Sequence, residues 1–393
     1  MVDKFVETTT KSWGSRIVGS FMGIIVGIIL FLGAFPLIFW NEGHSVNRIK
    51  TLNEGRSAVV ALSSDVIDPA HNGALIHLSG KATTTDTVAD SLFGVQETAL
   101  KLKRTVEMYQ WKESSQSKTE KNLGGSETTE TTYTYDKTWS GDAIDSSSFK
   151  KQDGHQNPSS MPYKSETFAA SNVTVGAFKL SDPFISQINS YEDYPLSQQN
   201  SDAMDPSVKA DYALSGNAYF HGDAASPQIG AVRISYGIVK PIDISVIGKQ
   251  DAGEIQTYFT KNGDISLLEI GNVSADGMFA SAESENKLIT WLIRLGAFLC
   301  MWIGLSLILG PISVFGDVIP FIGNILGAGI GLVTGVVALV LTFVTVAIAW
   351  IVFRPLIGIA LLAFAALFFF GGFKLIRSKL QSKAATPKPM PTT

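Results

Sequence analysis

Long apolar runs and segments of alternating apolar and polar residues divide this chain into two kinds of sequence. Ile17–Trp40 is an uncharged run of 24 residues, and only three residues between Lys287 and Lys374 carry a charge. The hydrocarbon core of a bilayer is ~30 Å thick, so about 20 apolar residues in a helix cross it. These runs predict membrane-spanning helices at both ends of the chain.

Four spans are expected, one before and three after a polar region. The first, Ile17–Trp40, is longer than the ~7–15-residue core of a signal peptide, and no small-residue cleavage site follows it, which favours an uncleaved anchor. The other three are separated by a turn around Asp317, between Pro311 and Pro320, and by a connector at Arg354-Pro355. They are expected over Leu295–Phe315, about Gly323–Phe353 and Leu356–Phe373.

Residues 41–290 show the alternation of β-strands. Val232, Ile234, Tyr236 and Ile238 recur at every second position, which directs one face of a strand toward a core. Asn262-Gly263 between two β-prone runs predicts a tight hairpin turn. The polar stretch Ser114–Thr132 is interpreted as a mobile loop between strands, and Arg104 as a residue at a sheet edge. The fold class expected is a multipass α-helical membrane protein with a large β-rich, α+β extracytoplasmic domain.

The charge distribution changes the meaning of the whole-chain values. The net charge of −4 and the 45% apolar content describe an ordinary soluble chain, but residues 41–290 alone hold 21 basic and 32 acidic residues. Such an acidic domain argues against a nucleic-acid partner. The single cysteine, Cys300, lies in an apolar run, so a disulfide-stapled fold is excluded.

Basic residues flank the first and last spans, which predicts that both termini are cytoplasmic. The expected organisation is therefore a cytoplasmic tail at 1–16, a span at 17–40, the extracytoplasmic domain at 41–290, a three-helix bundle at 291–373 and a basic cytoplasmic tail at 374–393. The membrane would be a bacterial inner membrane with a periplasmic domain, or the endoplasmic reticulum or inner nuclear membrane of a eukaryote.

Glycines recur every four residues in two of the spans. This spacing clears one helix face and lets another helix approach closely. Packing within the bundle, self-association and ordinary glycine abundance all remain possible explanations. The candidate packing residues are Gly19, Gly23, Gly27, Gly323, Gly327, Gly331 and Gly335.

Several short segments resemble the transmembrane protein 43 (LUMA) family, in the same order along the chain and with the same layout of one plus three helices. The segments are Val106–Trp111, Tyr133-Thr134-Tyr135 with Trp139, Ile144-Asp145-Ser146 with Phe149, Gly154–Pro158, Thr260–Asp264, Ala349-Trp350 and Arg354-Pro355-Leu356. The glycine-rich third span and the C-terminal tail depart from the family pattern, as in a bacterial or distant member.

The resemblance implies a multipass protein whose large domain faces a lumen. Animal members are associated with organising complexes of the inner nuclear membrane, so lamina-type partners would apply only to a eukaryotic source. The family supplies no catalytic residues to carry over. The motif residues whose role stays open are Glu107, Tyr109, Trp111, His155, Asn157, Pro158 and Arg354.

The sequence offers little catalytic chemistry. His155 with a carboxylate could act as a general base, but the same segment is typical of a polar turn in which His155 packs or bonds locally. His71 and His77 have poor spacing for zinc, and no nucleotide-binding or hydrolase motif occurs, so no metal or cofactor is expected. Glu107 and Arg104 are interpreted as a surface ion pair. The aromatic residues near 109–139 are either cross-strand pairs or an exposed partner surface.

Three functional hypotheses follow. The first is a non-enzymatic membrane organiser, which binds membrane proteins through its outer domain and whose glycine faces assemble its helices or copies of the chain. The second is a periplasmic or luminal enzyme that uses His155. The third is a channel or transporter, which the absence of ionisable residues in the middle of the spans disfavours.

Overall fold

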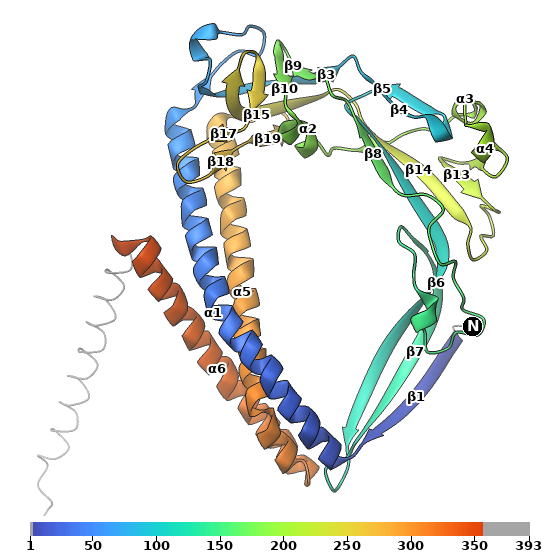
Figure 1. Cartoon of the computed structure of the whole chain (residues 1–393), viewed down its shortest axis with the longest axis vertical. Coiled ribbons are helices and arrows are strands. Elements are labelled where there is room, and N and C mark those ends of the chain that lie inside the picture. Colours follow the sequence, from blue (N-terminus) through green and yellow to red (C-terminus); the bar gives the residue numbers. More distant parts are fainter. Residues whose placement is uncertain (1–2, 357–393) are drawn as a thin grey trace, which may run out of the picture. The chain divides into compact units, whose positions relative to one another are not determined.

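Helix α1, Trp13–Ala58, is the longest element and follows directly on strand β1, Asp3–Lys11. The computed structural model describes residues 3–356, which divide into two compact units. The strand unit contains residues 3–12, 49–122 and 126–285, and the helix unit contains residues 13–48, 123–125 and 286–356. Figure 1 shows the elements of both.

The strand unit is built on two large sheets, with two small hairpins beside them. The first sheet has the order β1-β7-β6-β14-β13-β12, with β8 paired to β6 and β11 to β14. Its strands after β1 are β6 (Lys101–Lys121), β7 (Glu127–Ser140), β8 (Glu166–Ala169), β11 (Glu192–Asp193), β12 (Ala213–Ser215), β13 (Ala218–His221) and β14 (Val232–Val239).

The second sheet has the order β19-β15-β16-β10-β9-β3-β2, and β15 also pairs with β3. Its strands are β2 (Val60–Ala61), β3 (Leu75–Thr84), β9 (Val173–Val175), β10 (Phe178–Leu180), β15 (Ile242–Asp251), β16 (Glu254–Gln256) and β19 (Leu267–Ile270). The hairpins are β4 (Thr87–Asp90) with β5 (Val95–Thr98), and β17 (Tyr258–Phe259) with β18 (Asp264–Ile265). Short helices are α2 (Asp182–Gln187), α3 (Gln198–Asp202) and α4 (Pro206–Lys209), with 3-10 turns at Pro69–His71, Ser91–Phe93 and Ser146–Ser148.

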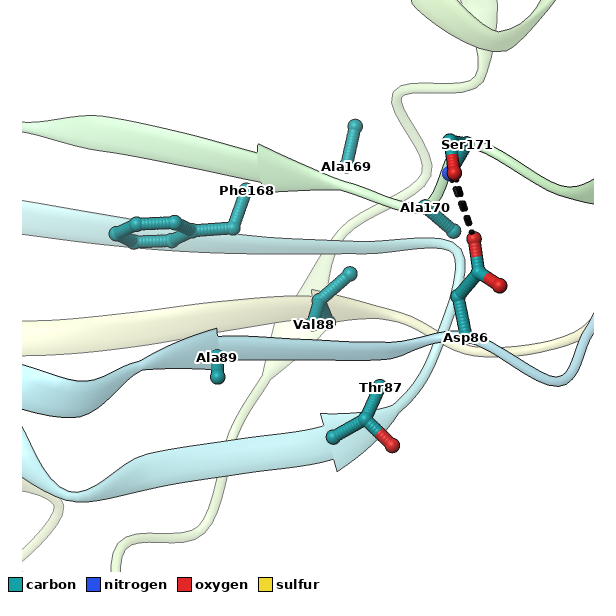
Figure 2. Close-up of a pocket in the computed structure, with 8 residues that line it drawn as sticks. All are labelled: Asp86, Thr87, Val88, Ala89, Phe168, Ala169, Ala170 and Ser171. Atoms are coloured by element: carbon teal, nitrogen blue, oxygen red, sulfur yellow. Dashed lines mark hydrogen bonds between the residues drawn. The ribbon is translucent and has the colours of Figure 1, made fainter.

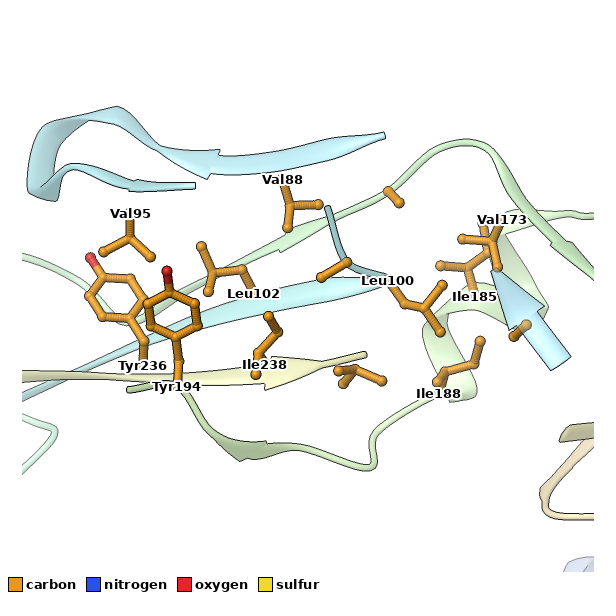
Figure 3. Packing of buried hydrophobic residues seen from close by; sticks show 14 of the residues in the cluster. Val88, Val95, Leu100, Leu102, Val173, Ile185, Ile188, Tyr194, Tyr236 and Ile238 are labelled. Carbon is orange, nitrogen blue, oxygen red and sulfur yellow. The ribbon is translucent and has the colours of Figure 1, made fainter. Parts of the chain in front are cut away.

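The two large sheets share one hydrophobic core. The predicted alternation in β14 is confirmed, because Val232, Ile234, Tyr236 and Ile238 are buried while the residues between them are half-exposed. Figure 3 shows part of this packing around Leu102 and Ile238. Each large apolar side chain removed from water in this way stabilises the fold by about 1.5–3 kcal/mol.

The prediction of a mobile loop over Ser114–Thr132 was wrong. These residues form most of a long hairpin, in which β6 and β7 pair without interruption from Met108↔Ser140 to Lys121↔Glu127. Hydroxyl pairs such as Ser117–Thr131, at 2.9 Å, join the strands across the ladder. The polarity of both faces hides this hairpin from a hydrophobic-period analysis, although threonine is a good strand former.

The N-terminal residues form a strand instead of a separate tail. β1 pairs with β7 from Asp3↔Tyr135 to Lys11↔Glu127. Polar paired strands belong in one aqueous compartment, because lipid leaves exposed main-chain groups unsatisfied. Residues 3–11 therefore belong with β7 in this structure. The sides of a membrane on which residues 1–16 and 41–290 lie stay a prediction.

Arg104 lies in the middle of the first sheet and not at its edge. Its neighbours across the ladder are Tyr236 on β14 and Glu166 on β8. The buried guanidinium forms ion pairs with Asp90, at 2.5 Å, and with Glu166, at 3.0 Å. The predicted pair with Glu107 is absent from the ion pairs of residues 3–356, where Glu107 bonds Arg233 instead.

The hairpin at Asn262-Gly263 is confirmed, but its loop is four residues long, 260–263, and neither Asn262 nor Gly263 has the positive φ of a tight two-residue turn. This loop closes the β17–β18 hairpin, in which Tyr258 pairs with Ile265 and the amide of Thr260 donates to the carbonyl oxygen of Gly263 at 2.7 Å. Two residues thus sufficed to locate a hairpin.

The helix unit contains most of α1, most of α5 (Ala275–Gly316) and all of α6 (Pro320–Phe353), and one end of α1 and one end of α5 belong to the strand unit. All three are long and apolar enough to cross a membrane. Within residues 3–356 the layout is one N-terminal plus two C-terminal spans, and not the predicted one plus three. The predicted fourth span, Leu356–Phe373, and the tail at 374–393 lie outside the described residues, apart from Leu356. The turn around Asp317 is confirmed between α5 and α6.

Candidate functional site

Three family-motif residues share one face of β6. Glu107, Tyr109 and Trp111 alternate along the strand, so their side chains emerge on the same side of the sheet. Trp139 on β7 lies opposite Tyr109, with ring centres 5.2 Å apart. We call Glu107, Tyr109, Trp111, Trp139 and Arg233 the motif face.

Two cationic side chains lie over the tryptophan rings of this region. Arg233 on β14 bonds Glu107 at 2.6 Å, and its guanidinium carbon lies 4.7 Å from the centre of the Trp139 ring. Lys137 lies 4.8 Å from the Trp111 ring. All five motif-face residues are half-exposed. Tyrosine, tryptophan and arginine in such a setting are the residues most often found at the energetic centre of protein interfaces.

His155 packs against the first sheet, where other side chains enclose it. Its ring stacks on Tyr135 with centres 4.1 Å apart and meets Trp111 edge-on at 4.6 Å. Nδ1 lies 3.0 Å from the carbonyl oxygen of Lys151, so Nδ1 carries a hydrogen. Nε2 lies 3.1 Å from a carboxylate oxygen of Asp3 on β1. His155 is 2% exposed, which agrees with the packed, locally bonded interpretation.

The carboxylate beside His155 comes from the far end of the chain. Asp3 also accepts from Nζ of Lys151 at 2.9 Å, and this bond, with the charges of Lys151 and His155, holds the pKa of Asp3 below its usual value. Burial and a hydrogen bond to Glu113 raise the pKa of Tyr135 to about 12. Sequence reasoning missed Asp3, because no local pattern ties it to residue 155.

Asn157 acts as a substitute for a neighbouring strand. Its Oδ1 accepts from the amide of Trp111 at 2.7 Å, and its Nδ2 donates to the carbonyl oxygens of Trp111, at 2.8 Å, and Ile144, at 3.2 Å. The carboxamide thus occupies the β6 edge as a peptide group would. Pro158 follows and packs near Gly230.

Beyond Trp111 the same edge of β6 is open. The main-chain groups of Tyr109 and Trp111 point away from β7, toward Gly230, Ala231 and Asn157. Main-chain groups alternate along a strand, so those of Ser115, Ser117 and Thr119 point the same way. No strand or side chain within the described range bonds them there. β1 lies at one end of this sheet, so among the strands of residues 3–356 its outer edge is also unpaired.

The motifs agree with a match to a known protein family. A family model described as transmembrane protein 43 matches residues 108–355, which is more than half of the chain. The chain belongs to the transmembrane protein 43 family. It is 32% identical over 365 residues to transmembrane protein 43 of Pongo abelii, covering 90% of this chain and 88% of that protein.

Two further relatives extend the comparison. Transmembrane protein 43 of Rattus norvegicus is 34% identical over 347 residues, covering 85% of each chain. The transmembrane protein 43 homologue of Drosophila melanogaster is 27% identical over 350 residues, covering 86% of this chain and 90% of the relative. No solved structure matches the chain significantly.

The remaining motif residue of this transmembrane protein 43 family member lies in the helix unit. Arg354 follows α6, with its guanidinium carbon 5.9 Å from the ring centre of Trp350. Trp350 donates to Glu42 of α1 at 2.7 Å, and Arg294 of α5 holds the same carboxylate through two bonds, of 2.6 and 2.8 Å. Glu42 is fully buried, so three helices meet on one ion pair. Sequence reasoning missed this cluster, although Glu42 and Arg294 stand out as single charges beside apolar runs.

The candidate packing glycines divide into two groups. A side chain at Gly27 would lie 2.6 Å from the carbonyl oxygen of Gly304, so α1 and α5 cross there, and Gly304 is the partner that sequence reasoning missed. Gly23, Gly323, Gly327 and Gly335 also have neighbours from other helices or the α5–α6 turn, whereas a Cβ at Gly19 or Gly331 would meet open space.

Two shallow depressions on the strand unit carry less chemistry. In the first, of about 500 Å³, Asp86 lies beside Ser171 and accepts from its amide and hydroxyl (Figure 2). The amide of Asn172 also donates to Asp86, so the carboxylate is already hydrogen-bonded within the protein. The bond from the Asn172 amide, with the other donors, lowers the pKa of Asp86. In the second, of about 470 Å³, Lys101 donates to the carbonyl oxygen of Ser186 at 3.0 Å, and burial lowers its pKa.

Proposed function

We propose that this transmembrane protein 43 family member is a membrane-anchored organiser, which binds an extended segment of a partner membrane protein through its strand unit. The observation that carries the proposal is the open β6 edge beside the motif face. A partner strand added at Ser115–Thr119 would gain main-chain hydrogen bonds, and the adjoining tryptophans and Arg233 would supply side-chain contacts.

Assembly through helices is a second part of the same proposal. The internal crossing at Gly27 and Gly304 supports packing within one chain, while the open faces at Gly19 and Gly331 are available to a second copy. In this proposal the body of the strand unit is extracytoplasmic, which the acidic charge of residues 41–290 supports.

A non-enzymatic role belongs to this proposal as well. The enclosure of His155 between Tyr135 and Trp111 supports it, since both ring nitrogens already face protein oxygens. The motif then has a structural purpose, which is to hold the loop 151–157 on the sheet where β6 loses its β14 neighbour.

Ser115→Pro tests the edge directly. Proline removes the amide hydrogen that faces the open side, so the β6–β7 ladder keeps its own bonds and the fold is expected to survive. We expect partner capture from native membranes to fall at least tenfold relative to the wild-type chain. Gln116→Pro is the matched control for folding, because its amide faces β7 and its loss should lower the unfolding temperature.

The result decides whether the β6 edge binds a partner and whether that partner is a second copy of the chain. Unchanged capture by a folded Ser115→Pro chain would refute the edge as the binding surface. Loss of self-capture alone, with no other protein affected, would assign the edge to a second copy of this chain.

A further inference from the structure

A groove between α5 and α6 runs along the apolar part of the helix unit. It has a volume of about 310 Å³ and is lined by Trp291, Leu295 and Phe298 of α5 and by Leu339, Phe343 and Val346 of α6. Leu295 and Phe343 are more than half exposed. In a bilayer these side chains face hydrocarbon, so the groove is shaped to take a flexible apolar chain.

One end of the groove carries positive charge. Arg294 and Trp350 line it there, and Arg354 lies over the same Trp350 ring. Arg294 is balanced by Glu42, which is buried beneath it, whereas no carboxylate in the portion from residue 3 to 356 lies within ion-pair distance of Arg354. Two guanidinium groups and one carboxylate leave a net charge of +1 at this end.

The surrounding tryptophans place this end at the membrane surface. Indole rings favour the boundary between headgroups and hydrocarbon, and Trp291 and Trp350 both lie against Arg294, at 4.8 and 5.7 Å. Guanidinium groups bind phosphate oxygens well, because their N–H groups match the geometry of two oxygens. A ligand that fits has an apolar tail and an anionic head in the same molecule.

We propose that this groove binds one acyl chain of an anionic glycerophospholipid, with the lipid phosphate held at Arg354 and Arg294. The bilayer supplies such a lipid at high local concentration, and basic sites between membrane helices are suited to acidic headgroups. The site is separate from the partner surface of the strand unit, so either proposal can fail without the other.

The test uses the full chain in liposomes that contain a photoactivatable phosphatidylglycerol or phosphatidylcholine, each with a diazirine on one acyl chain. Mass spectrometry of the cross-linked peptides reads out the site. We expect adducts on residues 291–298 and 339–346, with phosphatidylglycerol favoured over phosphatidylcholine. Arg354→Gln should reduce the phosphatidylglycerol adducts about fivefold, the size expected for one basic residue near a lipid surface.

A second pair of variants separates the groove from general lipid contact. Leu339→Trp fills the groove without touching its charges and should remove the adducts of both lipids. Val340→Trp is the matched control, since Val340 is exposed on α6 but does not line the groove. Equal labelling by both lipids that neither Arg354→Gln nor Leu339→Trp changes would overturn the proposal, as annular lipid only. Protection of the groove from both probes, with cross-links to residues 357–373 or to a second copy, would overturn it in favour of a protein occupant.

Discussion

Asn157 has more influence on the sheet than its polar loop suggests. Its side chain makes three hydrogen bonds to main-chain groups of Trp111 and Ile144 and so satisfies the edge of β6 at Trp111. His155, two residues earlier, joins the same loop to β1 through Asp3. The family motif therefore organises local structure at the boundary between the core of the strand unit and its long hairpin.

Asn157→Asp should destabilise the strand unit by about 2–4 kcal/mol. The aspartate keeps the shape of asparagine, but it loses two donors and faces two carbonyl oxygens with a negative charge. Thermal unfolding of the purified chain, followed by tryptophan fluorescence, measures the effect. Asn272→Asp, at an exposed position, is the control, and equal unfolding temperatures for the two variants would contradict the role given to Asn157.

Lowering the pH should remove the stabilisation that Asp3 provides. The hydrogen bond from Lys151 lowers the pKa of Asp3 in the folded chain below its unfolded value near 3.8. The contribution is therefore complete above that value and is lost as the pH falls through the folded pKa. The difference in unfolding temperature between the wild-type chain and Asp3→Asn should be present at pH 6 and shrink below pH 4. A difference that stays constant from pH 6 to pH 3 would exclude this role.

At the scale of elements, the strand order explains where sequence reasoning succeeded and failed. The spans, the alternation in β14 and the hairpin at Asn262-Gly263 have local signals, namely long apolar runs, a period of two and a residue pair typical of turns. The β6–β7 hairpin beyond Glu113 has polar residues on both faces, so no hydrophobic period marks it. The contact of Asp3 with His155 depends on β1 pairing with β7, and that pairing leaves no trace in either segment alone.

A disulfide tests the pairing of β1 with β7. Thr8 and Glu130 are partners in the ladder, and the close hydroxyl contact of Thr10 with Thr128, at 3.4 Å, marks the even-numbered residues of β1 as the closely spaced pairs. In a Cys300→Ser background, Thr8→Cys with Glu130→Cys should cross-link rapidly under mild oxidation. Thr8→Cys with Thr134→Cys, four residues out of register, is the control and should cross-link at least tenfold more slowly. Equal rates would show that β1 is not held in this register.

The crossing of α1 and α5 makes its own prediction. Gly27→Leu forces a side chain against the main chain of Gly304 and should destabilise the helix unit by about 1–3 kcal/mol. Gly33→Leu, where a Cβ meets open space on the same helix, should change stability little. Thermal unfolding in detergent, followed by the helical circular dichroism signal, compares the two. Similar losses for both variants would mean that Gly27 is no closer to another helix than Gly33.

At the scale of the whole molecule, the unexpected feature is that the residues on both sides of the apolar part of α1 belong to the strand unit. Residues 3–12 belong to the same compact unit as residues 49–122 and 126–285, although 17–40 is an apolar stretch long enough to cross a bilayer. The charge pattern predicted a cytoplasmic tail and an outer domain on opposite sides, and the pairing of β1 with β7 ties the tail to the domain. Impermeant labelling of Thr8→Cys and Glu130→Cys in intact vesicles should therefore modify both from one side.

Both functional proposals use surfaces that the fold leaves unfilled. In the strand unit these are the open β6 edge and the half-exposed motif face, and in the helix unit the groove that ends at Arg294 and Arg354. Ion pairs lie within each unit, that of Arg104 with Asp90 in the strand unit and that of Arg294 with Glu42 in the helix unit.

Site-specific photocross-linking in native membranes tests the central claim most directly. A photoreactive amino acid at Ser117, on the open edge, and one at Asp223, at an exposed position after β13, would be compared in the full chain. The account predicts a discrete cross-linked partner from Ser117 that disappears in the Ser115→Pro chain, and none from Asp223. No discrete product from Ser117, or a product that persists unchanged with Ser115→Pro, would contradict the proposal that this edge binds a partner.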